Sequence, residues 1–414
     1  MKKYVNLIVI LAALMMVSCS NDETNNESNQ PTGKVNTTLV EQGNCFAMKL
    51  FATANAQSPN EENLILSPLS LNMALAMVWN GANGQTKAAI LQAMGMSDFD
   101  PEYVNSHFQT MRQNLETADP NTQLALANSI WYRLGFPVKQ SFIDLNTTYY
   151  DALVQGLDFD NPSAVDIINQ WCSDNTNGLI PHMIDPPISA ETMMYLINAL
   201  YFKSLWADSC GFDPELTYQT NFTKGNNQQV DVQMMHQKNY LKYYSDDNLA
   251  MVTIPYGNNS FSMTFILPAS NSSFVAMLNA LQQNGYWQNC MNGRVKQMVN
   301  VDVPKFKLRY DSEETLVPIL TSLGMGIAFG DAADFSGIAD ASLCISNVKQ
   351  KTYIDVNETG TEAAAVTVIT IGVTSAGNGT PQFFANRPFL FVIQEESTGS
   401  VLFMGKIGHP QYEE

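Results

Sequence analysis

Residues 357–380 read NETGTEAAAVTVITIGVTSAGNGT and form the most unusual segment of this chain of 414 residues. The segment begins with a glycine turn, continues through small residues and becomes rich in β-branched ones. Alternate positions are uncharged over most of its length: Thr361, Ala363, Ala365, Thr367, Ile369, Ile371 and Val373. Such a strip can enter the middle of a sheet with one face against a core. Because residues 375–380 are small and polar, the strip is predicted to lead into a loop that proteases can cleave.

Residues 358–366 (ETGTEAAAV) closely resemble the hinge of the serpins, a family of suicide protease inhibitors. Five other segments resemble serpin motifs in the family's order: NLILSPLS (63–70), NALYFKSLW (198–206), ADFSGI (333–338), NRPFLF (386–391) and FMGK (403–406). The ordered set extends over residues 44–410. The resemblance implies an α+β serpin fold with mixed, mostly antiparallel sheets and a large central sheet. Helices surround the sheets in this fold, and a reactive-centre loop, here about 358–381, is exposed.

The resemblance also implies a mechanism, in which the chain is a suicide substrate and not an enzyme. In serpins a protease is acylated by the loop, which then inserts into the central sheet and carries the trapped protease with it. The matching hinge residues are Glu358, Thr359, Gly360, Thr361, Glu362, Ala363, Ala364, Ala365 and Val366. The family's spacing from Gly360 places the reactive bond at Thr374-Ser375, while Val373-Thr374 and Ser375-Ala376 stay open. Specificity would then depend on Ile371, Gly372, Val373 and Ala376.

Residues that control opening of the central sheet in serpins also have matches. The resemblance places Ser67, Ser70 and Asn198 at the shutter, beneath the point where the sheet opens, and Trp206 near the upper breach. At Gln350, also in the shutter, many serpins have histidine, which can be protonated where glutamine cannot. We therefore expect sheet opening without a histidine-linked pH dependence between pH 5 and 8. Simpler roles remain open: Ser67 as a helix cap and Asn198 as a partner for buried backbone.

Local patterns independently favour an α+β class with much antiparallel sheet. Ser67 and Pro68 predict the start of a helix that ends at Gly81, with an apolar stripe of Leu71, Ala74, Leu75 and Val78. Residues 251–256 with 260–267, and 389–394 with 400–407, predict two hairpins. Residues 299–303 and 306–310 alternate as strands do. The acidic pairs 246–247 and 395–396 fall in predicted turns, where we expect solvated surface.

The loop sequence restricts the protease partner. Residues 352–386 contain no Lys or Arg, so trypsin-like enzymes find no bond to attack. Ile371, Val373 and Thr374 suit elastase-like or subtilisin-like serine proteases, with papain-like cysteine proteases as a further class. Two alternatives remain: a non-inhibitory serpin that acts as a binding or carrier module at the cell envelope, and a nutrient-binding lipoprotein. The small hinge residues Ala363, Ala364 and Ala365 oppose the first.

The N-terminus predicts export. Lys2 and Lys3 precede an apolar run, residues 7–17, that is too short to span a bilayer. It ends in Met-Val-Ser-Cys19, which resembles the lipobox of bacterial lipoproteins; an ordinary secretory signal is the alternative. We therefore predict a signal peptide at 1–18, a lipidated Cys19 with a flexible tether at 19–37, and one domain at 38–414. The protein would be lipid-anchored at the bacterial outer membrane, on the surface or facing the periplasm.

Composition excludes other functions. The chain has 39 acidic residues against 21 Lys and Arg, a net charge of −18, which excludes nucleic acid as a partner. It also disfavours heparin-type activation, since no basic cluster precedes residue 123. Nucleophile-elbow, phosphate-loop and zinc-helix motifs are absent, so no metal or cofactor is predicted. Apart from Cys19, the five cysteines lack CxxC spacing, which predicts free, buried thiols. We also expect a monomer. Its only expected membrane contact is the N-terminal lipid.

Overall fold

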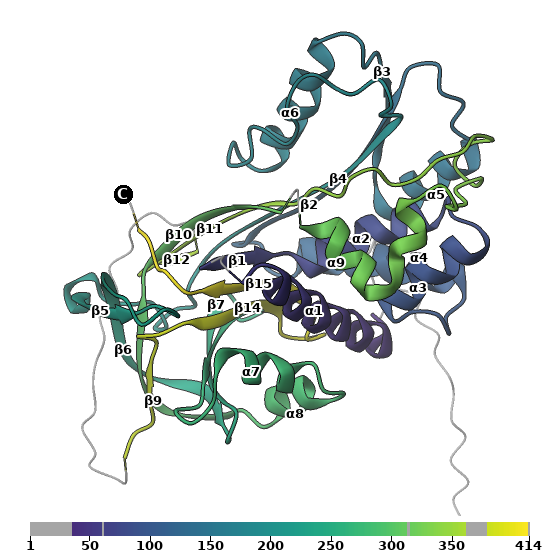
Figure 1. Ribbon diagram of the computed structural model, residues 1–414. Coiled ribbons are helices and arrows are strands. Elements are labelled where there is room, and N and C mark those ends of the chain that lie inside the picture. Colours follow the sequence, from purple (N-terminus) through teal and green to yellow (C-terminus); the bar gives the residue numbers. More distant parts are fainter. Residues whose placement is uncertain (1–34, 60–61, 313–314, 362–378, 413–414) are drawn as a thin grey trace, which may run out of the picture. The chain divides into compact units, whose positions relative to one another are not determined.

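Two sheets dominate the computed structural model, which describes residues 35–59, 62–312, 315–361 and 379–412. The six-stranded sheet runs β10-β11-β12-β4-β2-β3, and the nine-stranded one runs β1-β15-β14-β8-β7-β6-β9-β13, with β5 beside β6. Nearly all neighbouring strands in both sheets are antiparallel; the pairs β2/β3 and β13/β9 are parallel. This mixture of sheets and helices confirms the predicted α+β class (Figure 1).

The first sheet contains β2 (Gln123–Arg133), β3 (Leu153–Leu157), β4 (Met194–Leu205), β10 (Phe306–Asp311), β11 (Lys351–Asn357) and β12 (Gly360–Thr361). The second contains β1 (Asn63–Leu66), β5 (Tyr218–Thr223), β6 (Gln229–Ser245), β7 (Leu249–Tyr256), β8 (Phe261–Pro268), β9 (Val295–Pro304), β13 (Gln382–Phe384), β14 (Phe389–Glu395) and β15 (Val401–Ile407). The helices are α1 (Thr37–Gln57), α2 (Pro68–Trp79), α3 (Gly84–Met94), α4 (Pro101–Thr117), α5 (Gln140–Tyr150), α6 (Ser163–Asn175), α7 (Phe274–Leu281), α8 (Tyr286–Asn292) and α9 (Leu316–Leu320). In the described part of the chain, no helix is long and apolar enough to cross a membrane.

Both predicted hairpins are confirmed, as β7/β8 and β14/β15, and the alternating run forms β9 and β10. Helix α2 begins as predicted, because the Ser67 hydroxyl accepts the amide of Ser70 and Pro68 occupies the first turn. More of the helix is buried than the predicted apolar stripe. Since α2 contacts β4 in one sheet and β15 in the other, nearly every side chain of the helix is buried, Met73 and Trp79 included.

The expectation of solvated acidic turns is wrong for three of the four residues. Glu395 is buried and accepts the amides of the turn that follows it. Glu396 forms ion pairs with Lys242 (2.6 Å) and Arg294 (3.4 Å). Burial opposes its ionisation, but these cations lower the pKa of Glu396 below its ordinary value. Asp246 accepts the hydroxyls of two tyrosines, so only Asp247 is a solvated carboxylate.

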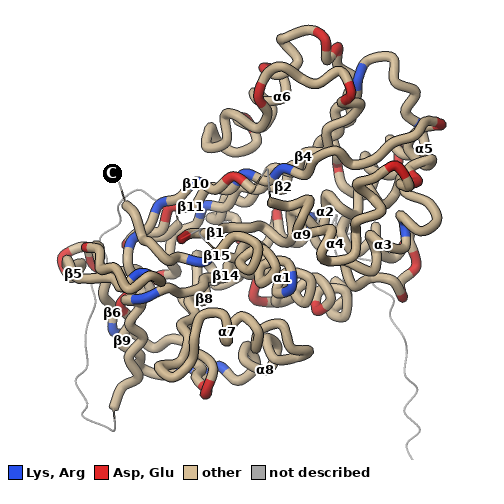
Figure 2. The backbone as a smooth tube through the Cα atoms, viewed as in Figure 1, with Lys and Arg blue, Asp and Glu red and all other residues tan. Residues whose placement is uncertain are grey.

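The prediction of free cysteines is confirmed for the five that the structure describes, Cys45, Cys172, Cys210, Cys290 and Cys344. The prediction that they are buried holds for Cys172 and Cys290, whose pKa values burial raises to about 12 and about 11. Cys344 is exposed instead. Along the backbone, acidic residues occur on several helices and loops (Figure 2).

Candidate functional site

The six-stranded sheet is open between β4 and β11. Strand β12 has only two residues; its ladder pairs Gly360 with Leu205 of β4 and Asn357 of β11. Beyond β12, no ladder joins β4 to β11 in the residues that the structure describes. On its other side β4 pairs with β2 over ten residues. Below Ser204, this edge of β4 therefore forms no ladder with another described strand, and we call the interval between β4 and β11 the slot.

The start of the hinge is locked into the top of the slot. Gly360 has φ of +156°, and a Cβ atom there would collide with the backbone of β4, so only glycine fits. The Thr361 hydroxyl lies 2.5 Å from the hydroxyl of Tyr256, a buried ring stacked on Trp206 at 4.5 Å. The Trp206 indole donates to the Asn357 carbonyl at 3.0 Å. Trp206 therefore lies beside the hinge, next to a tyrosine that the sequence did not indicate.

Glu358 anchors the base of the loop. Its carboxylate is buried, forms an ion pair with Lys305 at 2.8 Å and accepts the Thr217 hydroxyl at 2.7 Å. Its carbonyl accepts the amide of Phe212, and the carbonyl of Thr359 accepts that of Trp206. These bonds hold the chain leaving β11 against β4 and the following loop. Sequence reasoning missed Lys305 and Thr217, since no spacing along the chain connects either one to Glu358.

A second group of buried polar side chains lies under the slot. The side-chain amide of Gln350 accepts a hydrogen bond from the Ser67 N–H at 2.8 Å and donates one to the Ser67 carbonyl at 2.9 Å. The Ser67 hydroxyl donates to Leu402, and that of Ser70 donates to the Asn198 amide oxygen. Asn198 in turn donates to Asn128 at 2.5 Å. The structure thus brings all four predicted shutter residues together, adds Asn128, and also shows Ser67 as a helix cap; their role in sheet opening stays a prediction.

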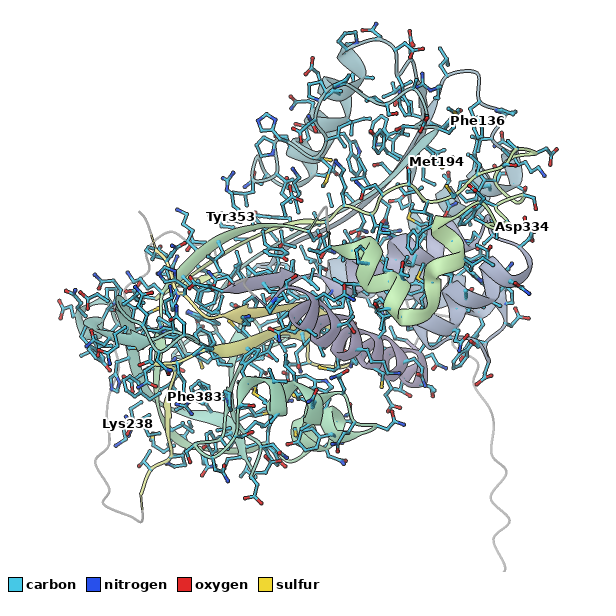
Figure 3. All side chains as sticks on the ribbon, in the orientation of Figure 1. Phe136, Met194, Lys238, Asp334, Tyr353 and Phe383 are labelled. Carbon is cyan, nitrogen blue, oxygen red and sulfur yellow. The ribbon has the colours of Figure 1, made fainter. Side chains whose placement is uncertain are left out.

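An apolar cavity of about 290 Å³ lies where β4 begins. Its lining includes Leu71 and Leu75 of α2, Met194 and Leu196 of β4, and the segment 342–349 that precedes β11. Figure 3 labels Met194 at the end of β4 near α5 and Tyr353 of β11 toward the opposite end of the sheet, near β10. The lower part of the slot therefore has an unfilled, apolar floor.

Several predicted residues lie outside the described part of the chain: Cys19, the hinge residues Glu362, Ala363, Ala364, Ala365 and Val366, and the reactive-bond region Ile371, Gly372, Val373, Thr374, Ser375 and Ala376. Their predictions stand as made.

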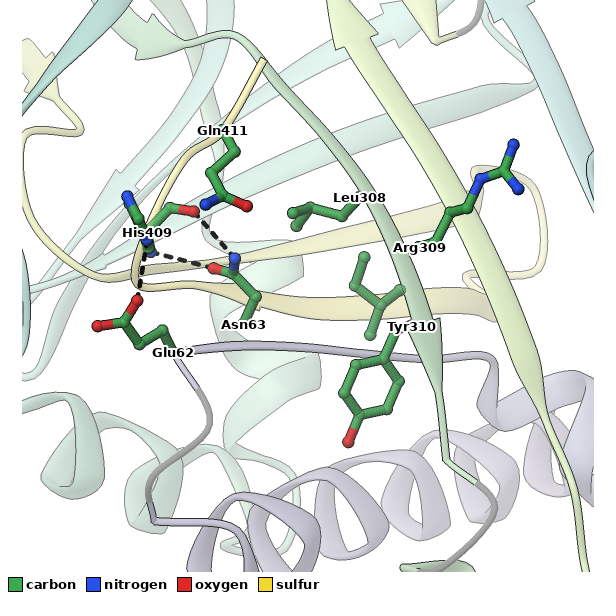
Figure 4. A pocket seen from close by; sticks show the side chains of 8 residues that line it. Glu62, Asn63, Leu308, Arg309, Tyr310, His409 and Gln411 are labelled. Atoms are coloured by element: carbon green, nitrogen blue, oxygen red, sulfur yellow. Dashed lines mark hydrogen bonds and ion pairs between the residues drawn. The ribbon is translucent and has the colours of Figure 1, made fainter. Parts of the chain in front are cut away.

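A separate polar pocket of about 410 Å³ lies beside β1, β10 and the C-terminal segment (Figure 4). The Glu62 carboxylate is bonded to His409 at 2.9 Å and to Lys224. Asn63 donates to the His409 carbonyl and accepts two amides from the same turn. Because these groups satisfy one another, they fasten the C-terminal segment to β1 and nominate no second functional site.

Comparisons with known proteins agree with this geometry. The family model described as Serpin (serine protease inhibitor) matches residues 41–410. A serpin-like protein of Methanosarcina acetivorans is 32% identical, covering 91% of this chain and 89% of its own, and neuroserpin of Homo sapiens is 32% identical over 85% and 87%. Among solved structures, the thermophilic serpin tengpin in its native state has a TM-score of 0.81 at 30% identity, covering 91% of this chain and 95% of its own. Human thyroxine-binding globulin in complex with thyroxine has a TM-score of 0.80 at 26% identity, covering 91% and 99%. The predicted fold is thereby confirmed, and the chain belongs to the serpin family.

Proposed function

We propose that this chain is a suicide-substrate inhibitor of elastase-like or subtilisin-like serine proteases, and of papain-like cysteine proteases as a further class. Cleavage occurs near Thr374-Ser375, and the loop then inserts into the slot with the protease attached. The observation that carries the proposal is the slot itself, occupied at its top by Gly360 and Thr361 and open below.

The β12 ladder sets the register of the inserted strand. Since Thr361 pairs with Ser204 in an antiparallel ladder, each further loop residue pairs one residue earlier on β4. Continued down the slot, this register places Thr367 opposite Asn198. The Asn198 side chain points toward Ser70 of α2. Inserted residues whose side chains lie on the same face of the sheet as Asn198 therefore point into the core. These are the uncharged alternate positions that begin at Thr361.

The same register fits the cavity to the loop. Ile369 falls opposite Leu196, and Ile371 falls opposite Met194. Both β4 residues line the cavity of about 290 Å³. In this register, Ile369 and Ile371 reach the apolar cavity.

New ladder hydrogen bonds and newly buried side chains favour insertion of the loop. About ten new ladder bonds contribute roughly 0.5–1.5 kcal/mol each, and burial of Ile369, Ile371 and Val373 adds about 1.5–3 kcal/mol apiece. A millionfold slowing of the acyl-enzyme needs about 8 kcal/mol. The bonds and the burial together contribute roughly 10–24 kcal/mol, from which the ordering of the loop, about 1–2 kcal/mol per residue, is deducted.

The rival function is a non-inhibitory binding or carrier module. It is favoured by the likeness to thyroxine-binding globulin, whose structure contains thyroxine. Small hinge side chains and an open slot favour the inhibitor, because a carrier needs neither.

The deciding experiment mixes the protein with an elastase and with a subtilisin and searches for a complex that survives SDS. N-terminal sequencing of the released fragment identifies the cleaved bond, and thermal melts compare intact with cleaved protein. We expect a stable complex, cleavage at or beside Thr374-Ser375, and a large rise in melting temperature. Clean cleavage with full protease activity and no rise in melting temperature establishes the rival.

We also propose lipid anchoring through Cys19 at the bacterial outer membrane. The lipobox-like sequence is the support. Labelling of cells with a radioactive fatty acid should mark the wild type and spare Cys19→Ala. Equal labelling of both proteins rejects this anchor.

A further inference from the structure

A small cavity away from the slot is lined by two residues that each carry a buried polar atom without a partner among the described residues. It measures about 10 Å³ and is lined by α1, α2, α4, Met96 and the start of β15. The unpartnered atoms are Oδ1 of Asn72, from α2, and Nδ1 of His107, from α4. Their residues are 3% and 5% exposed, so bulk solvent does not satisfy them.

Such atoms are costly in a protein interior. A buried acceptor or donor without a partner costs about 1–3 kcal/mol, and natural structures pair nearly all such groups with protein or with ordered water. Two of them on one cavity therefore indicate a common occupant that can bond both.

The size and chemistry of the cavity select that occupant. About 10–15 Å³ is the minimum for one water molecule, so about 10 Å³ admits one water and nothing larger. Water can donate to Oδ1 and either donate to or accept from Nδ1, whichever tautomer the ring adopts. Ser400 also lines the cavity; its hydroxyl donates to the sulfur of Met111 in a weak 3.7 Å contact, and it supplies a third polar group.

We propose that one buried water molecule occupies this cavity and bridges Asn72 to His107, joining α2 to α4 beside the β14/β15 turn. This water bridge would lie beside hydrogen bonds already present. Asn44 of α1 donates to the Gly399 carbonyl at 2.8 Å and accepts the Val401 amide at 3.1 Å. With the water in place, α2 is joined to α4 beside the turn to which Asn44 fastens α1.

The surroundings keep the joint electrically neutral. Each element that packs on the ring presents uncharged residues to the cavity: Leu39, Val40, Gly43 and Asn44 from α1, Leu69 and Asn72 from α2, Phe108 and Met111 from α4, and Met96, Ser400 and Val401 from the remaining chain. Burial in this setting lowers the pKa of His107 to about 4. The ring is therefore neutral at physiological pH, and one of its nitrogens needs a donor.

A crystal structure at a resolution that shows ordered solvent tests the proposal directly. We expect one water peak within about 2.7–3.2 Å of both Asn72 Oδ1 and His107 Nδ1. An empty cavity, or a direct bond between the two side chains, overturns it.

Solution measurements provide an independent test. Oxygen-17 relaxation dispersion counts long-lived internal waters, and nitrogen-15 spectra report the His107 ring. Asn72→Leu should remove one such water and shift the Nδ1 resonance. The matched control is Asn146→Leu, which also removes a buried, unpartnered amide oxygen but does not line this cavity; it should leave the Nδ1 resonance unchanged. An unchanged water count in folded Asn72→Leu refutes the proposal, and if that variant does not fold, the wild-type crystal structure decides.

Discussion

Thr361→Arg is the substitution that separates an inserting loop from a merely cleavable one. Thr361 is 3% exposed, pairs with Ser204 and Val356, and shares a 2.5 Å hydrogen bond with Tyr256. Loss of that bond costs about 1 kcal/mol, and burial of a guanidinium without a carboxylate partner costs at least about 3 kcal/mol more.

In the uncut protein the two-residue strand β12 can leave the sheet and avoid this cost of about 4 kcal/mol, whereas a fully inserted strand must bury the residue. If the transition state for insertion already contains this residue, insertion slows about a thousandfold. Hydrolysis of the acyl-enzyme is unaffected, because the bond it breaks lies far along the loop. The protease therefore escapes, and the inhibitor becomes a substrate.

The assay titrates active elastase with each variant and measures the moles of inhibitor consumed per mole of enzyme inactivated. We expect a value near one for the wild type, and consumption without an SDS-stable complex for Thr361→Arg. Glu362→Arg is the matched control, since the proposed register assigns position 362 to the outward-facing alternate set, and the change should leave trapping intact. A folded Thr361→Arg protein that traps the protease as the wild type does refutes the proposed register.

Three other substitutions have defined outcomes. Glu358→Gln leaves Lys305 without its 2.8 Å ion-pair partner and should lower the free energy of unfolding by about 3 kcal/mol in urea titrations, with Lys305→Met in the same chain restoring part of the loss. Burial lowers the pKa of His107 from 6.5 to about 4, so the folded state binds fewer protons at this residue than the unfolded chain does. The contribution of His107 to the free energy of unfolding should be constant above about pH 6.5 and fall by up to about 3 kcal/mol toward pH 4. His107→Gln should flatten that slope. Gln350→His should introduce a pH-dependent step in the loop-insertion rate between pH 5 and 8, measured by stopped-flow fluorescence, whereas an equally steep step in the wild type contradicts the role assigned to Gln350.

Features encoded by neighbouring residues could be predicted from the sequence. Ser67 and Pro68 define the start of α2 because a cap and a first-turn proline act within one helical turn. Both hairpins follow from alternation and short turns. The hinge was recognised through its resemblance to a family, and the structure supplies what that resemblance lacked: the ladder that fixes Gly360 and Thr361 in register with β4.

Contacts between distant segments could not be predicted. Lys305 meets Glu358, and Tyr256 meets Thr361, only because the sheets bring β9, β7 and the hinge together. The same reason explains the error at Glu396. A turn position indicates exposure, but this carboxylate pairs with Lys242 of β6 and with Arg294, which precedes β9. Neither cation lies near Glu396 in the sequence.

The slot shows why stability and function oppose each other in this fold. A side chain reaching into the cavity of about 290 Å³ would stabilise the uncut protein, by up to about 7 kcal/mol at roughly 24 cal/mol per Å³. That filling would occupy the place that the register assigns to Ile369 and Ile371. A substitution such as Leu196→Trp that reaches into the cavity should therefore strengthen the intact protein and weaken the inhibitor together.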